Sequence, residues 1–181
     1  DQLFASPLSD QGLFRFDASV ASVFPDMINR SVPGYATVVG MTGTLAAQHA
    51  RPDSQIYDLG CSWGASLLSA AREPACDRCA LIGIDNSEAM VEQAGTYLGE
   101  FPEAARIQLR HADVLNTPLE NASVVIMNYT LQFIPIRERE TLLRRIREAM
   151  MPGDVFILSE KLTLTDQRLN EYLIDLHYEF K

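Results

Sequence analysis

The chain has 181 residues, of which 47% are hydrophobic and 22% are charged. These proportions are typical of an ordinary globular protein, and the length suits one domain over residues 1–181. The formal net charge is −9. Proteins that grip nucleic acid usually present a basic patch to the phosphates, so direct nucleic-acid binding is disfavoured. No run approaches the roughly 20 apolar residues that span a bilayer, and no signal-peptide pattern opens the sequence. We therefore expect a cytoplasmic protein without a membrane partner.

The N-terminal third predicts helices. Residues 1–15 show no strong period, and Asp17 is placed to cap a first helix. Pro25 suits the first turn of a second short helix. The segment 31–35 contains Pro and Gly and interrupts this region, after which helical spacing continues to about Ala50. We expect residues 1–54 to form a helical region that precedes the α/β core.

From residue 55 onward, short apolar strands alternate with helices. Strands that are apolar throughout and separated by helices indicate a parallel sheet covered on both faces, so the predicted fold class is α/β. The predicted strands are 56–59, 81–85, 107–110, 124–128 and 155–159, and the predicted helices are 66–71, 87–98, 137–150 and 166–181. Pro152-Gly153 is expected to end the third of these helices.

The basic residues cluster on the predicted helix 137–150. They are Arg137, Arg139, Arg144, Arg145 and Arg147, interleaved with glutamates. Mixed signs at this spacing are typical of a solvated helix face, which again disfavours a nucleic-acid surface.

The chain contains three cysteines, an odd number that argues against a disulfide framework. Cys76 and Cys79 form a Cys-x-x-Cys pair, which could be redox-active or half of a zinc site. No second Cys or His pair stands at metal-ligand spacing, and His49, His111 and His177 are scattered. The favoured interpretation is a surface loop with two thiols and no metal.

The stretch 55–65 reads as a strand, a Gly-rich turn and the start of a helix. Gly60 and Gly64 allow a sharp turn and a close approach of the backbone to a ligand. Alone this is weak evidence, because strand-to-helix turns need glycine for steric reasons.

Polar residues follow four successive predicted strands. Parallel strands end at one edge of the sheet, where ligands of open α/β sheets bind. The residues are Asp58, Gly60, Cys61 and Ser62; then Asp85 and Asn86; then Asp113 with Val114; and finally Asn128. Each has a structural alternative: Asp85 could cap a helix, Asp113 could make a turn and Asn128 could hold a loop. Together they favour a nucleotide-like ligand, with the carboxylate of Asp85 on a ribose diol.

Four of these segments resemble the class I S-adenosylmethionine-dependent methyltransferases. They are Asp58-Leu-Gly60, Ile84-Asp-Asn-Ser87, His111-Ala-Asp-Val114 and Asn128. The resemblance implies a Rossmann-like class I methyltransferase fold. The sequence departs from the common pattern at Ser62, where a second glycine would be usual.

Longer segments resemble a narrower family, the carboxy-S-adenosyl-L-methionine synthases. They include Val23-Phe-Pro-Asp-Met-Ile-Asn-Arg-Ser-Val-Pro-Gly-Tyr35, Tyr57-Asp-Leu-Gly-Cys-Ser62, Tyr129-Thr-Leu-Gln-Phe133 and Leu158-Ser-Glu-Lys161. The resemblance implies an enzyme that converts S-adenosyl-L-methionine and prephenate to carboxy-S-adenosyl-L-methionine and phenylpyruvate. It further implies that the product serves modification of the wobble uridine of tRNA, and that the enzyme is a homodimer.

The resemblance also implies the cofactor contacts. By position they are Tyr35, Gly60, Cys61, Ser62, Asp85, Asn86, Asp113, Val114 and Asn128. Asp85 would take the ribose, Asp113 the adenine and the Gly60–Ser62 backbone the methionine portion. Tyr35 would reach in from the N-terminal helices as a lid, although core packing is an equal alternative for it.

The family also uses an arginine for the substrate carboxylate, on a segment beyond the position of Lys181. We therefore expect the core, residues 55–181, to continue past Lys181, and we assign neither a carboxylate-binding cation nor a catalytic residue within the chain. Two rivals stay open: an ordinary small-molecule methyltransferase, and a non-catalytic S-adenosylmethionine-binding module.

Overall fold

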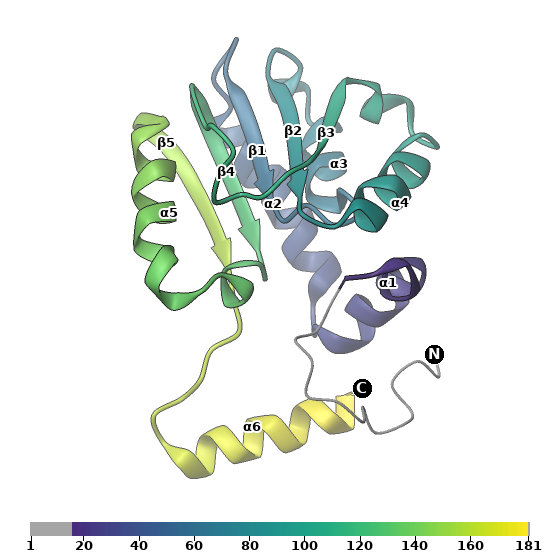
Figure 1. Ribbon diagram of the computed structural model, residues 1–181, viewed down its shortest axis with the longest axis vertical. Helices are drawn as coiled ribbons and strands as arrows, with labels where there is room; N and C mark the ends of the chain where they lie inside the picture. The colour runs from purple at the N-terminus through teal and green to yellow at the C-terminus, as the bar shows by residue number, and fades with distance from the viewer. Residues whose placement is uncertain (1–15, 181) are drawn as a thin grey trace.

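A computed structural model describes residues 16–180, and the expectations for residues 1–15 and for Lys181 lie outside this range. Its centre is a five-stranded sheet in the order β3-β2-β1-β4-β5, with all four strand pairs parallel (Figure 1). The strands are β1 (Gln55–Leu59), β2 (Ala80–Asp85), β3 (Ile107–His111), β4 (Ala122–Asn128) and β5 (Met150–Ser159). The predicted α/β fold is confirmed, and strand order reverses between β1 and β4.

Helices cover both faces of the sheet, because the strands are apolar on both faces. The α-helices are α1 (Ala18–Ser31), α2 (Tyr35–His49), α3 (Ala65–Ala71), α4 (Glu88–Leu98), α5 (Ile136–Glu148) and α6 (Gln167–Phe180). Ala46 of α2 and Leu67 of α3 pack with Ile56 on one face, whereas Leu142 and Ile146 of α5 pack on the other. The packing of the strands between these helices therefore positions the residues at the strand ends.

The expectation that Pro25 starts a second helix is wrong. Pro25 lies inside α1, which Asp17 caps as predicted by accepting hydrogen bonds from the amides of Ser19 and Val20. Proline has no N–H, so the carbonyl of Ala21 lacks its usual helical donor. The indole Nε1 of Trp63 donates to this carbonyl oxygen at 3.1 Å. A hydrogen bond from a side chain distant in the sequence thus replaces the helical bond that Pro25 cannot make.

The end of α5 also differs from the prediction. The helix stops at Glu148 and β5 begins at Met150, before Pro152-Gly153. The register shifts here, because Ala122 pairs with Met150 whereas Val124 pairs with Val155. The four residues 151–154 therefore form a bulge inside β5, and Pro152-Gly153 lie within it rather than after a helix.

The two thiols of the Cys-x-x-Cys pair are not on a surface loop. Cys76 is fully buried and Cys79 is 5% exposed, and both belong to the core cluster with Leu81. Burial raises the pKa of the Cys76 thiol to about 11. These cysteines behave as small apolar core residues, a role that the sequence spacing did not predict.

The arginines of α5 only partly fit a solvated face. Arg137, Arg144 and Arg147 are exposed, as predicted. Arg145 is half-buried, and its guanidinium donates to the carbonyl oxygens of Val114, Leu115 and Thr117. This arginine fixes the loop after β3 to α5, which corrects the expectation for that position.

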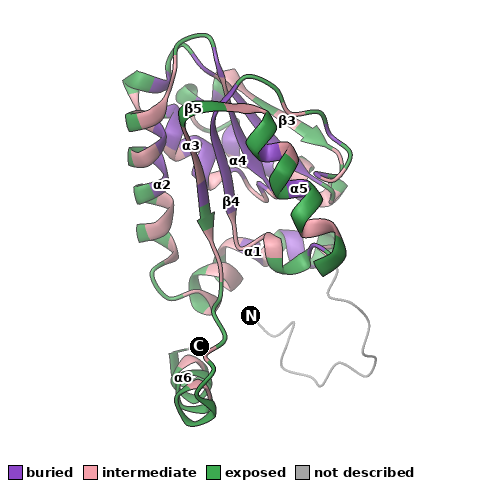
Figure 2. Ribbon diagram, turned by 90° about the vertical axis from the view of Figure 1, so that its left-hand side faces the viewer, coloured by how far each residue is buried: buried purple, intermediate pink, exposed green. Residues whose placement is uncertain are grey.

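The last helix, α6, stands away from the body of the molecule. A long connection leads to it from the end of β5, and Figure 2 shows it exposed on nearly all sides. None of its residues is buried, and its exposed apolar side chains include Leu169, Tyr172, Leu173 and Leu176. Among residues 16–180, no helix has the length and apolar character needed to cross a membrane.

Candidate functional site

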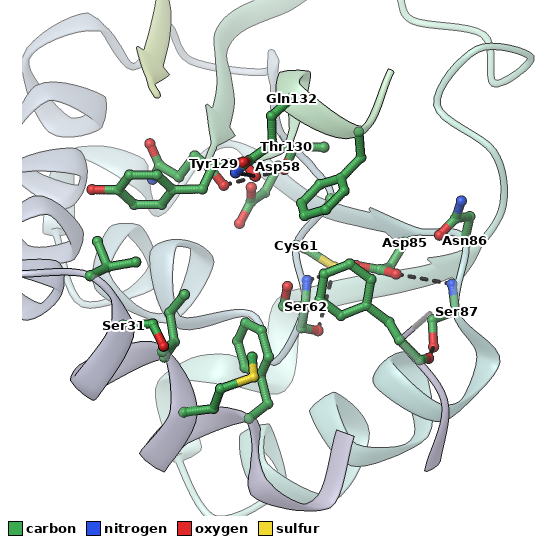
Figure 3. Close-up of a pocket in the computed structure, with 18 of the residues that line it drawn as sticks. Ser31, Asp58, Cys61, Ser62, Asp85, Asn86, Ser87, Tyr129, Thr130 and Gln132 are labelled. Atoms are coloured by element: carbon green, nitrogen blue, oxygen red, sulfur yellow. Dashed lines mark hydrogen bonds between the residues drawn. The ribbon is translucent and has the colours of Figure 1, made fainter. Parts of the chain in front are cut away.

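A cavity of about 1700 Å³ opens at the carboxyl ends of the strands, beside α1 and the start of α2 (Figure 3). All nine residues predicted to contact the ligand line it: Tyr35, Gly60, Cys61, Ser62, Asp85, Asn86, Asp113, Val114 and Asn128. Asp58, which the sequence placed at a strand end without a role, lines it as well. The parallel sheet brings these residues together because its strands all end at one edge.

The Gly-rich turn after β1 uses its own amide groups inside the protein. The N–H groups of Gly60 and Cys61 both donate to the carbonyl oxygen of Ile84, at 2.8 and 3.1 Å. The N–H of Ser62 donates to Oδ2 of Asp85 at 2.9 Å. The amides of residues 60–62 are therefore used inside the protein, where they fix the turn to β2.

Glycine at position 60 has two structural causes. Its φ is +79°, a conformation that favours glycine. A Cβ there would lie 2.4 Å from Oγ1 of Thr130. The space beside Gly60 is thus filled by the loop after β4. Ser62, where the common methyltransferase pattern would have a second glycine, keeps a left-handed backbone with φ +47°, so the turn retains its shape at that departure.

Asp85 is held by two backbone amides. Its Oδ1 accepts from the N–H of Ser87 at 2.9 Å while Oδ2 accepts from Ser62. The helix cap itself is Ser87, whose hydroxyl accepts from the N–H of Met90. Burial raises the pKa of Asp85, although these amides lower it. A carboxylate has about four acceptor positions, so Asp85 can still receive two hydroxyl groups.

Asp58 is the most perturbed acid of the site. It is 3% exposed, at the bottom of the cavity between Asp85 and Tyr129 in Figure 3. Burial, together with the negative charge of Asp85, raises its pKa to about 7. Two buried acids that repel each other favour a cationic ligand, because a cation would stabilise both carboxylates. The signal in the sequence was an acid ending an otherwise apolar strand.

Asn128 is oriented by two hydroxyl groups from different helices. Its Nδ2 donates to Oγ1 of Thr42 at 3.2 Å and to Oγ of Ser66 at 3.1 Å. These two bonds leave Oδ1 as a buried acceptor with no partner among the described residues. Buried acceptors are normally satisfied, so Oδ1 is positioned for a ligand donor. The sequence pointed to Asn128 but not to Thr42 or Ser66.

Asp113 and Val114 follow β3. Oδ1 of Asp113 accepts from the N–H of Leu115 at 2.8 Å, so this residue does make the turn considered as its alternative role. Asp113 is exposed at the rim of the cavity, whereas Val114 is buried. The guanidinium of Arg145 donates a hydrogen bond to the carbonyl oxygen of Val114. Asp113 thus supplies a hydrogen-bond acceptor, and Val114 supplies an apolar surface.

Two tyrosines form the opposite side of the cavity. The rings of Tyr35 and Tyr129 lie 6.4 Å apart and are tilted by 42°. Burial raises the pKa of Tyr35 to about 12, with Asp58 adding to the effect. Its hydroxyl is therefore protonated at neutral pH. Tyr129 has φ +59°, an unusual conformation for a bulky residue that recurs at functional sites. Sequence reasoning did not assign Tyr129 a site role.

Three basic side chains also line the cavity: Arg30, Lys161 and His177. None was predicted, because they come from the end of α1, the segment after β5 and α6, which are distant in the sequence. Among residues 16–180 no group of three or more His, Cys, Asp or Glu side chains could hold a metal ion.

Comparison with known proteins defines the class first. The family described as "Methyltransferase domain" matches residues 56–153. A protein of Methanococcus maripaludis assigned to the S-adenosyl-L-methionine-dependent methyltransferases superposes with a TM-score of 0.66 at 16% identity, covering 94% of this chain and 74% of that one. The structure titled "DhpI-SAM-HEP complex" gives 0.61 at 20% identity, covering 86% and 66%. The chain has the fold of the class I S-adenosylmethionine-dependent methyltransferases.

Curated relatives then define the family. The carboxy-S-adenosyl-L-methionine synthase of Photorhabdus laumondii is 46% identical over the whole of this chain, which spans 72% of that protein. The synthase of the same name from Vibrio cholerae is also 46% identical, and the chain spans 74% of it. The chain belongs to the carboxy-S-adenosyl-L-methionine synthase family.

Proposed function

We propose that this chain forms carboxy-S-adenosyl-L-methionine from S-adenosyl-L-methionine, with prephenate as carboxyl donor and with phenylpyruvate and water as the other products. The hydroxide that leaves prephenate and the proton that leaves the methyl group form the water. The observation that carries the proposal is that all nine expected contact residues line one cavity, in a chain of this family. The cavity volume of about 1700 Å³ exceeds the roughly 300–1000 Å³ of ordinary ligand pockets, which leaves room for a second substrate.

The residues present fit S-adenosylmethionine. Asp85 binds the ribose diol, and Asp113 with Val114 binds the adenine. Asn86 and Cys61 line the same part of the cavity. The methionine portion carries a cationic ammonium beside the sulfonium, which suits the acceptor groups of the Gly60–Ser62 turn and the buried carboxylate of Asp58. The unpartnered Oδ1 of Asn128 accepts a further ligand donor. When bound, S-adenosylmethionine supplies the methyl carbon that receives the carboxyl group.

The helices α1 and α2 close the cavity as a lid over the core that begins at β1. Tyr35 and the end of α1 are the parts of this lid that line the cavity. Trp63 links the Gly-rich turn to α1 through Ala21, so lid and turn move together. The protein acts in the cytoplasm as a single-domain enzyme.

The protein acts as a homodimer. The apolar side chains of α6 are exposed along the helix, with Tyr172 at 62% and Leu169 at 50%. A second copy of the chain would cover this face, because a soluble monomer rarely leaves so large an apolar surface in water. The product then serves wobble-uridine modification of tRNA through a partner enzyme. The net charge of −9 disfavours direct binding of RNA by this chain.

The test is mass spectrometry of the small molecule that copurifies with the protein, followed by turnover with prephenate. A species about 44 mass units above S-adenosylmethionine, as the addition of carbon dioxide requires, and phenylpyruvate release are expected. Release of S-adenosylhomocysteine when an acceptor is supplied would instead support an ordinary methyltransferase. Binding without any turnover would support a non-catalytic module.

A further inference from the structure

The charge of the cavity changes sign across the sheet. Acids stand at or near the carboxyl ends of the first three strands in spatial order: Asp113 after β3, Asp85 as the last residue of β2 and Asp58 next to the last residue of β1. The neutral Asn128 ends β4. Lys161 comes two residues after β5, whose last residue Ser159 pairs with Asn128. Neighbouring strands are about 4.8 Å apart, so the acids and the lysine lie at opposite ends of the cavity.

Lys161 is the basic group at this end that has no counter-ion in the described part of the chain. Its side chain is exposed and lines the cavity, and it forms no ion pair with residues 16–180. Arg30 lines the cavity too, but its Nε is 2.9 Å from Oδ1 of Asp26. Glu160, the neighbour of Lys161, is not among the residues that line the cavity, but its Oε1 is buried without a partner among the described residues, and its charge adds to the raised pKa of Tyr129.

We propose that Lys161 binds the carboxylate of the second substrate at the β5 end of the cavity. This inference rests on the proposed function, because it presumes that a carboxylate donor enters beside S-adenosylmethionine. It deepens that function by naming a substrate-positioning residue within residues 16–180. His177 of α6 lines the same cavity and adds a second basic side chain near its mouth.

Electrostatics give the reason for this placement. A donor with two carboxylates would be repelled by Asp58 and Asp85 at the cofactor end. The ammonium of Lys161 attracts it toward β5, and Tyr129, which follows β4 between Asp58 and Lys161, offers aromatic surface for its ring together with Tyr35. The donor would then lie alongside the methionine portion of the cofactor instead of competing for the adenine site.

The experiment measures binding and turnover separately. Phenylpyruvate, which carries one carboxylate, is titrated into the S-adenosylmethionine-loaded protein by calorimetry, and the KM for prephenate is measured in parallel. Lys161→Gln should weaken phenylpyruvate binding and raise the KM for prephenate by roughly tenfold, as expected for one charge-assisted hydrogen bond. S-adenosylmethionine affinity should stay unchanged. Lys161→Arg should keep most of the affinity because it keeps the charge.

Arg147→Gln is the matched control, since it removes one positive charge from the exposed face of α5, outside the cavity. It should bind phenylpyruvate as the unmodified protein does. The inference is overturned if Lys161→Gln binds phenylpyruvate normally, if Lys161→Arg fails to restore binding, or if the unmodified protein has no affinity for the carboxylate. If carboxylate binding depends on Lys161 but prephenate is not turned over, the proposed function fails and this inference stands.

Discussion

The indole N–H of Trp63 donates to the carbonyl oxygen of Ala21, which Pro25 leaves without a helical donor. One hydrogen bond therefore both repairs α1 and fastens it to the Gly-rich turn. The ring of Trp63 also lies 5.6 Å from that of Tyr97 on α4. Trp63 thus ties α1 to the Gly-rich turn and to α4.

This relationship predicts a coupling between residues 25 and 63. Trp63→Phe should lower the free energy of unfolding by about 1–2 kcal/mol, because a buried carbonyl loses its donor. In a Pro25→Ala background the same change should cost less, since the substituted residue offers its own backbone N–H to the carbonyl of Ala21. Denaturant unfolding of the four proteins gives the coupling. Equal costs in both backgrounds would contradict the proposed repair of the helix.

Asp58 predicts a stability that depends on pH. Its pKa is about 7 in the folded protein, above the ordinary value of 3.8, so the folded state binds the extra proton between these values. Stability should therefore fall as pH rises from about 4 to about 7 and become level above that. Asp58→Asn should flatten this slope, as measured by denaturant midpoints across the pH range.

The same acid predicts proton release on cofactor binding. A cationic ligand favours the ionised form of Asp58, so below pH 7 binding should expel a proton and affinity should rise with pH. Calorimetry at pH 6 in buffers of different ionisation enthalpy measures the proton count. Asp58→Asn should release markedly fewer protons, and an unchanged count would assign the proton to another group.

Asn128 is oriented by hydrogen bonds to the hydroxyl groups of Thr42 and Ser66. We therefore predict that these two hydroxyl groups control ligand affinity. Thr42→Val and Ser66→Ala each remove one acceptor from Nδ2 of Asn128, so the amide loses its fixed orientation. We expect S-adenosylmethionine affinity to fall about fivefold to tenfold in each. Thr44→Val on the same helix, where the hydroxyl is exposed and bonds only to the carbonyl of Gly40, should leave affinity unchanged. Equal affinity in all three would remove Asn128 from the ligand contacts.

One methyl group added at Gly60 is expected to lower both the stability of the protein and its affinity for the cofactor. Gly60→Ala meets both the positive φ and the contact with Thr130, so it should destabilise the protein by more than about 2 kcal/mol and abolish cofactor binding. Gly40→Ala in α2 has open space around its Cβ and should stabilise by about 0.5–1 kcal/mol. Thermal unfolding compares the two, and similar midpoints would show that the turn is not constrained.

Much of the fold could be predicted because the relevant signals are local. Apolar runs bounded by Gly and Pro placed five strands to within a few residues, except at β5, where a bulge extended the strand back to Met150. Eight of the nine predicted contact residues line one cavity because the ends of parallel strands coincide, whereas Tyr35 reaches it from the start of α2.

The sequence by itself therefore determined the strand pattern and the set of polar residues at one edge of the sheet, through periodicity and chain direction. Only the tertiary structure decided how those groups are used. The amide of Ser62 donates to Asp85, and the indole of Trp63 donates to the carbonyl that Pro25 leaves without a donor. Lys161 lines the same cavity as Asp58, Asp85 and Asp113. Such pairings join residues far apart in the chain, and no local propensity encodes which distant partner will satisfy a given donor or charge.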